Sequence, residues 1–441
     1  MKPKITLLLL AFIMIVGTIH SQNPDKTFTD GAYIVDMGQN STLAKGLKPY
    51  GFVYALIRNN NVPVYWSINS AKVKDGKDFT ANGKDYRGGT FIIASEDINP
   101  TITTLIATWR TNGAVIDGPI ASSFTAPIYN KLTSWPRAIL DTQNDGLITP
   151  YYANAGVPSV SYVTQGDPTD LTSCGDIYVL PHADPQKWPE SYVTALKNYM
   201  DQGGSLWVGC HAVSALDLVS PPFNFLTDNG LVPWTSHDKP DNSDVYTYDP
   251  STDTDPIMQF MDKMDASLHN GSEEIFLPKV GSSWLPSTKV AIYNDPYTDG
   301  KTHITYDSTN RAALLAYGRT NGDPTKGMVM YQAAHSYDGS GTTASEIAAE
   351  RAYFNFVLLS GIQKQISITL SGTFPTALAP NTLYPLSATV TGNIGAVTYE
   401  WSALGGGTFS PATGTTPGPT ITTNYTAPAV IGNIALRLKV T

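Results

Sequence analysis

The sequence predicts an α/β fold, with a mostly parallel sheet that carries helices on both faces, followed by an all-β sandwich. Two observations support this prediction. From residue 32 to about residue 359, short apolar runs alternate with amphipathic stretches, which is typical of a parallel sheet covered by helices. Beyond residue 363, charged side chains become rare, and short alternating runs rich in Thr, Gly and Pro indicate a sandwich of short strands.

Each expected element follows from a local pattern. The expected strands, which are apolar or alternating runs, are 33–36, 62–66, 137–141, 159–163, 177–180, 205–209 and 328–332. The expected helices are 47–58, 147–154 and 189–201. The last helix is the best defined, because its apolar residues recur at helical spacing and Gly203 and Gly204 end it. Residues 231–280 are irregular and rich in Asp, Pro, Ser and Thr, which predicts an insertion or a lid.

Length and charge limit the possible partners. The chain has 441 residues, a formal net charge of -9, 15% charged residues and two cysteines. At about 100–200 residues per domain, this length excludes a small disulfide-stapled scaffold. The acidic balance, without a basic run after the N-terminus, argues against nucleic acid or an anionic membrane surface as partner.

The N-terminus predicts export. Lys2 and Lys4 precede an apolar run at 5–16, which indicates a signal peptide and is short for a membrane span of about 20 residues. A secreted or cell-surface protein that does not span the membrane is therefore expected. The strand-like run at 434–440 predicts further modules beyond Thr441. The expected division is a signal peptide at 1–21, an N-terminal α/β region at 25–135, a second α/β domain at 136–361 and a β-sandwich at 366–441.

The two cysteines are expected to be free thiols. Cys174 precedes the strand 177–180, whereas Cys210 follows the strand 205–209. If these strands are parallel neighbours, the sulfurs lie at opposite edges of the sheet, about five residues apart at about 3.3 Å each. A disulfide needs Cα atoms within about 7 Å of each other, so this placement excludes one.

Polar and nucleophilic side chains follow three expected strands. These are His182, Ala183 and Asp184 after 177–180, Cys210 and His211 after 205–209, and His335 after 328–332. Because ligands collect at the carboxyl ends of parallel strands, we expect these side chains to converge. A cysteine at a tight strand-to-helix turn suits a nucleophile, and a nearby histidine suits its base. We predict Cys210, His211 and His335 as catalytic residues, and His182, Ala183 and Asp184 as substrate-binding residues.

Four phrases carry a family resemblance: DIYVLP, YMDQGGSLWVGCH, GMVMYQAAH and AERAYFNFVLLSGI. Through them, residues 136–361 resemble the class I glutamine amidotransferase-like superfamily, most closely its trehalose-utilisation (ThuA-like) branch. The resemblance implies a flavodoxin-like sheet, with His211 and His335 as site histidines. The amidotransferase and intracellular-protease branches place a cysteine where Cys210 stands. Amidotransferases carry an acid two residues after the late histidine. Here the neighbouring Asp338 is the expected catalytic acid, with Glu96 as an alternative.

The C-terminal segment has its own resemblance. Trp401 and the phrase NYTAP, at 424–428, match the PKD-like and bacterial Ig-like modules of surface proteins over residues 366–441. This resemblance implies an Ig-like sandwich, with Trp401 in its core.

The sequence leaves the function open between an enzyme and a binding protein. The preferred hypothesis is an exported protein whose amidotransferase-like head keeps a Cys/His site and acts on or binds carbohydrate. The alternatives are a non-catalytic adhesion protein and a thiol-dependent amide or acyl hydrolase. No cofactor is expected. A metal site built from His182, His211 and His335, together with Asp184, is less favoured because these ligands have no compact spacing.

The irregular segment offers two weaker alternatives. Its aspartates suggest calcium but lack EF-hand spacing, so a solvated loop is expected; they are Asp238, Asp241, Asp244, Asp249, Asp253 and Asp255. Its aromatic residues suit either sugar stacking or a core position; they are Trp234, Tyr246, Tyr248 and Trp284.

Overall fold

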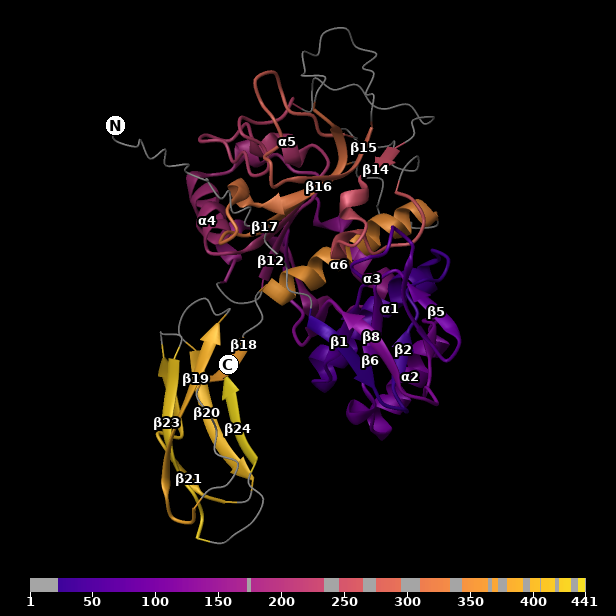
Figure 1. Cartoon of the computed structure of the whole chain (residues 1–441). Coiled ribbons are helices and arrows are strands. Elements are labelled where there is room, and N and C mark those ends of the chain that lie inside the picture. Colours follow the sequence, from indigo (N-terminus) through magenta and orange to yellow (C-terminus); the bar gives the residue numbers. More distant parts are fainter. Residues whose placement is uncertain are drawn as a thin grey trace, which may run out of the picture.

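The protein is a mixed α/β structure with separate antiparallel sheets near the C-terminus (Figure 1). The computed structural model describes residues 23–172, 176–233, 246–264, 275–294, 310–333, 343–363, 367–371, 379–391, 397–404, 406–416, 420–429 and 435–440. The signal-peptide prediction at 1–21 and Cys174 lie outside these ranges. Among the described residues, no helix is both long and apolar enough to cross a membrane.

An eight-stranded sheet forms the centre, in the order β11-β10-β12-β13-β17-β16-β15-β14. Its parallel strands are β10 (Arg137–Asp141), β11 (Tyr162–Gly166), β12 (Asp176–Leu180), β13 (Ser205–Gly209) and β17 (Met328–Gln332). Antiparallel strands extend one edge: β16 (Ala312–Arg319), β15 (Lys289–Asn294) and β14 (Tyr246–Tyr248). The prediction of a mostly parallel sheet is confirmed here, and β12 and β13 are parallel neighbours as expected. The strand predicted at 159–163 begins only at Tyr162, because residues 159–161 form a 3-10 turn after Pro158.

Helices lie on both faces of this sheet. Tyr178 pairs in register with Leu206, and Val179 with Trp207, so Tyr178 and Trp207 point to opposite faces. The Tyr178 ring contacts Trp188, just before α4 (Glu190–Asp201), whereas the Trp207 ring contacts Tyr353 of α6 (Ala344–Gln363). The helix predicted at 189–201 is confirmed as α4, whose apolar face is buried and whose end is marked by Gly203 at φ +86°.

The N-terminal region has its own sheet, and this sheet is antiparallel. Its order is β7 (Ile116–Asp117), β2 (Tyr33–Val35), β6 (Thr90–Ile93), β3 (Val64–Ser67) and β9 (Asn130–Leu132). The expectation of parallel pairing is therefore wrong for this region. The strands β2 and β3 do run in the same direction, joined by helical turns that include α1 (Lys48–Tyr54), but β6 pairs antiparallel with both and separates them. The hairpin of β4 (Lys77–Ala81) and β5 (Lys84–Arg87) precedes β6, so the chain enters the sheet from the opposite end.

Further elements complete the part of the chain from β1 to α6, residues 23–363, which we call the head. They are β1 (Asn23–Phe28) paired with β8 (Phe124–Ile128), α2 (Pro100–Thr111), α3 (Thr149–Ala155) and α5 (Ala212–Leu216). The helix expected at 147–154 is observed as α3.

A buried polar contact on α6 joins the N-terminal region to the central sheet. The Arg351 guanidinium, which is 0% exposed, donates to the backbone oxygens of Met37 (3.1 Å), Gly88 (3.2 Å) and Gln259 (3.1 Å). One turn later, Asn355 donates to the Gln259 oxygen (3.0 Å). A single apolar cluster runs through both regions, and Figure 1 shows α6 between them. The N-terminal region is thus packed as one body with the central sheet.

Two antiparallel sheets form the C-terminal segment. One holds β18 (Ser367–Ser371), β19 (Leu383–Thr391), β23 (Thr420–Thr426) and β21 (Thr408–Ser410), and the other holds β22 (Thr413–Thr416), β20 (Val397–Leu404) and β24 (Ala435–Val440). Trp401 and Tyr425, one from each sheet, are buried in a common apolar cluster. This cluster is separate from that of the head.

Replacing Arg351 with Met tests how far the head depends on this contact. The substitution leaves the buried Met37 and Gly88 oxygens without their donor, at about 1–3 kcal/mol each, whereas the Gln259 oxygen keeps Asn355, so we expect a loss of at least about 2 kcal/mol in the free energy of unfolding. Urea unfolding followed by tryptophan fluorescence measures it. Arg58→Met, at an exposed position, is the control and should change stability by less than about 0.5 kcal/mol. Equal midpoints for the two variants would contradict the prediction.

Candidate functional site

Cys210 occupies a constrained turn between β13 and α5. Its φ is +52°, in the left-handed region that residues other than glycine rarely adopt. Its backbone N–H donates to the Gln332 oxygen at the end of β17 (3.1 Å), and a side chain on the preceding Gly209 would meet the Trp207 ring at 2.6 Å. The turn therefore fixes the direction of the Cys210 side chain, which is a free thiol and is 0% exposed.

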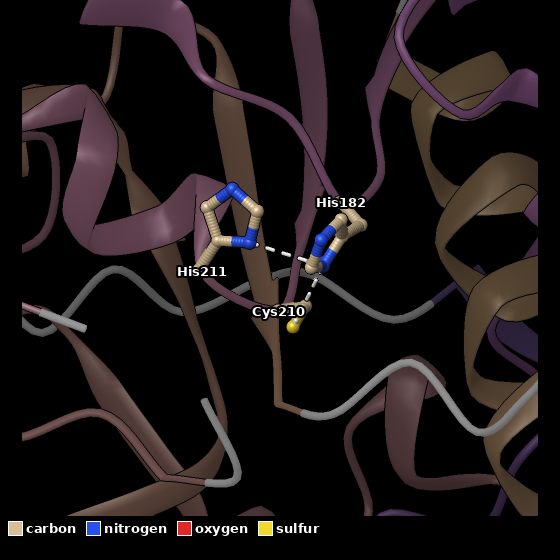
Figure 2. A group of neighbouring side chains, drawn as sticks. All are labelled: His182, Cys210 and His211. Atoms are coloured by element: carbon tan, nitrogen blue, oxygen red, sulfur yellow. Dashed lines mark hydrogen bonds between the residues drawn. The ribbon is translucent and has the colours of Figure 1, made fainter. Parts of the chain in front are cut away.

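His182 lies beside this thiol, at the carboxyl end of the neighbouring strand β12. Its Nδ1 is 3.3 Å from the Cys210 Sγ and 3.0 Å from the His211 Nδ1 (Figure 2). The two imidazole rings meet at right angles, with centroids 3.9 Å apart. His182 is half-buried and His211 is buried. One nitrogen of His182 thus faces both the sulfur and the second imidazole.

Asp184 supports the far side of His211. Its Oδ1 is 3.2 Å from the His211 Nε2, and its Oδ2 is 2.6 Å from the Lys187 Nζ. The hydrogen bond from Lys187 lowers the pKa of Asp184, which is therefore ionised at neutral pH. An ionised carboxylate can only accept, so His211 donates its Nε2–H to Asp184, and in the neutral imidazole Nδ1 is then the nitrogen with the lone pair.

The loop after β10 holds these groups in place, and its residues Gln143 and Asn144 are not among those predicted from the sequence. The Gln143 side-chain oxygen accepts from the Asp184 backbone N–H (3.0 Å), and the Asn144 side chain donates to the His182 carbonyl oxygen. Asp141 in turn accepts from the Gln143 backbone N–H (2.8 Å) and from the Tyr178 hydroxyl. The polar run directly after the strand 137–141 was the available signal, because β10 ends at the same edge as β12 and β13.

The structure brings together the larger part of the predicted site. Cys210, His211, His182 and Asp184 form one chain of contacts, and Ala183 is buried within the His182 loop. His182, expected to bind substrate, contacts the thiol and His211, and Asp184, with the same expected role, contacts His211. His335 and Asp338 lie outside the described residues. Glu96, the alternative acid, lies in the N-terminal region and pairs with Lys26 (3.7 Å).

The irregular segment has bonding of its own. Asp249 pairs with Arg311, and Asp255 pairs with Lys289 (2.6 Å), so both carboxylates already have a cation. Tyr246 is buried, Tyr248 and Trp284 are half-buried, and the Trp284 indole donates to the Arg311 oxygen (2.9 Å). Trp234, Asp238, Asp241 and Asp244 lie outside the described residues. The solvated-loop interpretation is replaced, for Asp249 and Asp255, by ion pairs at the sheet edge.

Comparison of the chain with family models and with curated proteins gives no match. The geometry of the site therefore carries the functional conclusion.

Asp141, which holds the Gln143 loop, makes the stability of the protein depend on pH. Burial raises the pKa of Asp141 from 3.8 to about 6, so between these values the folded state holds a proton that the unfolded chain has lost. Stability consequently falls as pH rises through this window, by up to about 3 kcal/mol, and stays at the lower level above pH 6. Asp141→Asn cannot ionise, and its side chain can still bond to Gln143 and Tyr178. Its stability relative to the wild type should therefore rise by about that amount from pH 4 to pH 7.

Urea unfolding across this pH range measures the difference. Asp30→Asn, at an exposed position, is the matched control. A difference between wild type and Asp141→Asn that does not vary with pH would contradict the assignment.

Proposed function

We propose that the α/β head is a thiol-dependent hydrolase that acts on amide or ester bonds, with Cys210 as nucleophile. The observation that carries this proposal is the forced left-handed turn at Cys210, together with the 3.3 Å contact between its sulfur and His182 Nδ1. A nucleophile at a strand-to-helix turn, next to a base that a third group orients, is the recurring arrangement of covalent catalysis.

Each residue then has a distinct role. His182 accepts the Cys210 proton as the sulfur attacks the carbonyl carbon of the substrate. The protonated His182 ring donates to the lone pair on His211 Nδ1, which the Asp184 carboxylate keeps available. His182 next gives its proton to the departing amine or alcohol, and the carbon–nitrogen or carbon–oxygen bond breaks, leaving a thioester. Water hydrolyses the thioester and restores the thiol, with His182 again transferring the proton.

The strand order supports a flavodoxin-like head. If the five parallel strands are numbered 1 to 5 along the chain, their order across the sheet is 2-1-3-4-5, from β11 to β17. This is the flavodoxin-type order. In such sheets ligands bind at the carboxyl edge, next to the point where the order reverses. His182 follows the third strand and Cys210 the fourth, so both lie at that edge. Membership of the amidotransferase-like superfamily and a carbohydrate as substrate or ligand remain proposals from the sequence.

The C-terminal sheets support an Ig-like sandwich, since Trp401 is buried between two antiparallel layers. Together with the signal-peptide pattern at 1–21, this segment leads us to propose a secreted or cell-surface location.

A second candidate is a non-catalytic binding head carried by the Ig-like module. The observation that favours it is the burial of Cys210, whose side chain is 0% exposed. A sulfur enclosed in this way fits a purely structural thiol as well.

Acylation by p-nitrophenyl acetate separates the two candidates. In the presence of a chelator, the wild type should gain one acetyl group on Cys210, detected by intact-protein mass and peptide mapping. Cys174→Ser should react at the wild-type rate, and Cys210→Ser should not react. His182→Ala should react at least about 100-fold more slowly, because it lacks the base.

Absence of an acetyl adduct on Cys210 in the folded wild type would refute the hydrolase proposal and favour the binding head. Circular dichroism of each variant shows whether a lost reaction comes from lost structure.

A further inference from the structure

We infer that Cys210, His182 and His211 form a binding site for a divalent zinc ion. Their ligand atoms, one sulfur and two imidazole nitrogens, all lie within 4.8 Å of one another. Thiolate and imidazole are the ligands that Zn²⁺ prefers, and three protein ligands of this kind are typical of zinc sites that keep a further position for water or another donor. The inferred site differs from the set weighed from sequence, because Cys210 takes the place given there to His335.

One nitrogen of this cluster has two partners within hydrogen-bond distance. The His182 Nδ1 faces two partners, the Cys210 sulfur at 3.3 Å and the His211 Nδ1 at 3.0 Å. An imidazole nitrogen has one position in the ring plane, which holds either a hydrogen or a lone pair. It therefore bonds well to one of these partners at a time. A cation placed among the three atoms receives a lone pair from each of them.

The spacing is close to that of a tetrahedral zinc site. Bonds of about 2.0–2.1 Å to nitrogen and about 2.3 Å to sulfur imply ligand separations of about 3.4 Å between the nitrogens and about 3.6 Å between nitrogen and sulfur. The two separations at His182 Nδ1, 3.0 Å and 3.3 Å, are shorter by a few tenths of an ångström, and the third pair, the Cys210 sulfur and the His211 nitrogen, lies within 4.8 Å. Zinc binding therefore requires the His182 nitrogen to move a few tenths of an ångström away from both partners.

Asp184 supplies the support that a metal-binding histidine needs. Histidine ligands commonly donate their second ring N–H to a carboxylate, which fixes the tautomer and orients the ring toward the metal. His211 has this arrangement, with Nε2 against Asp184 Oδ1 (3.2 Å) and Nδ1 directed into the cluster. Asp184 is itself held by the Gln143 side chain and by Lys187.

The donor set also selects the class of ion. Magnesium and calcium prefer oxygen ligands, whereas one thiolate and two imidazoles suit an ion of intermediate softness such as zinc. Binding replaces the Cys210 thiol proton with a sulfur–zinc bond and releases that proton to solvent. If Cys210 is the nucleophile of the proposed hydrolase, bound zinc blocks it. Only this inhibitory consequence rests on the proposed function.

Metal titration of the full chain tests the site directly. Protein stripped with a chelator should bind one Zn²⁺, measured by competition with a chromophoric chelator and by elemental analysis. Co²⁺ should give the intense sulfur-to-metal absorption of a thiolate complex. Cys210→Ser should lose this absorption, and His182→Ala and His211→Ala should lose tight binding. Cys174→Ser, at the other cysteine of the sequence, is the matched control and should keep all of these properties.

Asp184→Asn removes no ligand, so it tests the site without dismantling it. We expect its zinc affinity to fall about 10- to 100-fold, as is usual when the carboxylate behind a histidine ligand is removed. Failure of the folded wild type to bind Zn²⁺, or Co²⁺ binding without sulfur absorption, would overturn the inference. If Cys210 is acetylated in the presence of chelator but the protein does not bind zinc, the zinc site is refuted and the proposed hydrolase is not. Zinc binding without acetylation would refute the hydrolase and leave the metal site standing.

Discussion

The arrangement of the head depends on the buried contact that Arg351 makes across three segments of backbone. Burying a guanidinium is costly unless acceptors meet its donors, and here the backbone oxygens of Met37, Gly88 and Gln259 accept from its two terminal nitrogens, while the buried Nε has no hydrogen-bond partner among the described residues. Because these oxygens belong to distant parts of the chain, α6 cannot shift without breaking several hydrogen bonds at once. Gln332, the last residue of β17, also contacts this helix: its side-chain nitrogen donates to the Ala349 backbone oxygen (3.4 Å). Gln332 in turn holds the Cys210 backbone. The turn at the thiol is thus tied to the junction between the two regions.

A second constraint comes from the parallel sheet itself. Its strands β10, β12 and β13 end at one edge, so a polar residue that follows any of them reaches the same place. The structure fills this edge from three loops, with Gln143, His182 and Cys210 each following a different strand. No loop provides the site alone, which explains why its residues have no compact spacing in the sequence.

Much of this edge could be predicted from the sequence. The apolar runs at 177–180 and 205–209 and the helix between them fix a parallel pair, and this pair brings His182, Cys210 and His211 to one edge. Which histidine touches the sulfur could not be predicted, because that depends on loop conformation and side-chain rotamers. The same limit applies to Asp184, whose contact with His211 follows from the path of the His182 loop. In the N-terminal region the sequence pattern predicts β2, α1 and β3 correctly. It does not predict β6, which follows the hairpin of β4 and β5 and lies between β2 and β3 in the sheet.

The proposed thiol chemistry and the inferred zinc site follow from one property of the cluster, which is the contact of a single imidazole nitrogen with two partners. His182 Nδ1 faces both the Cys210 sulfur and the His211 Nδ1, and an imidazole nitrogen holds either one hydrogen or one lone pair. A single proton joins at most two of these atoms, so it is exchanged easily between sulfur and imidazole, as a nucleophile and its base require. A zinc ion joins all three and therefore competes with that proton for the same lone pairs. The geometry that makes the thiol easy to activate is for this reason also the geometry that makes it easy to metallate.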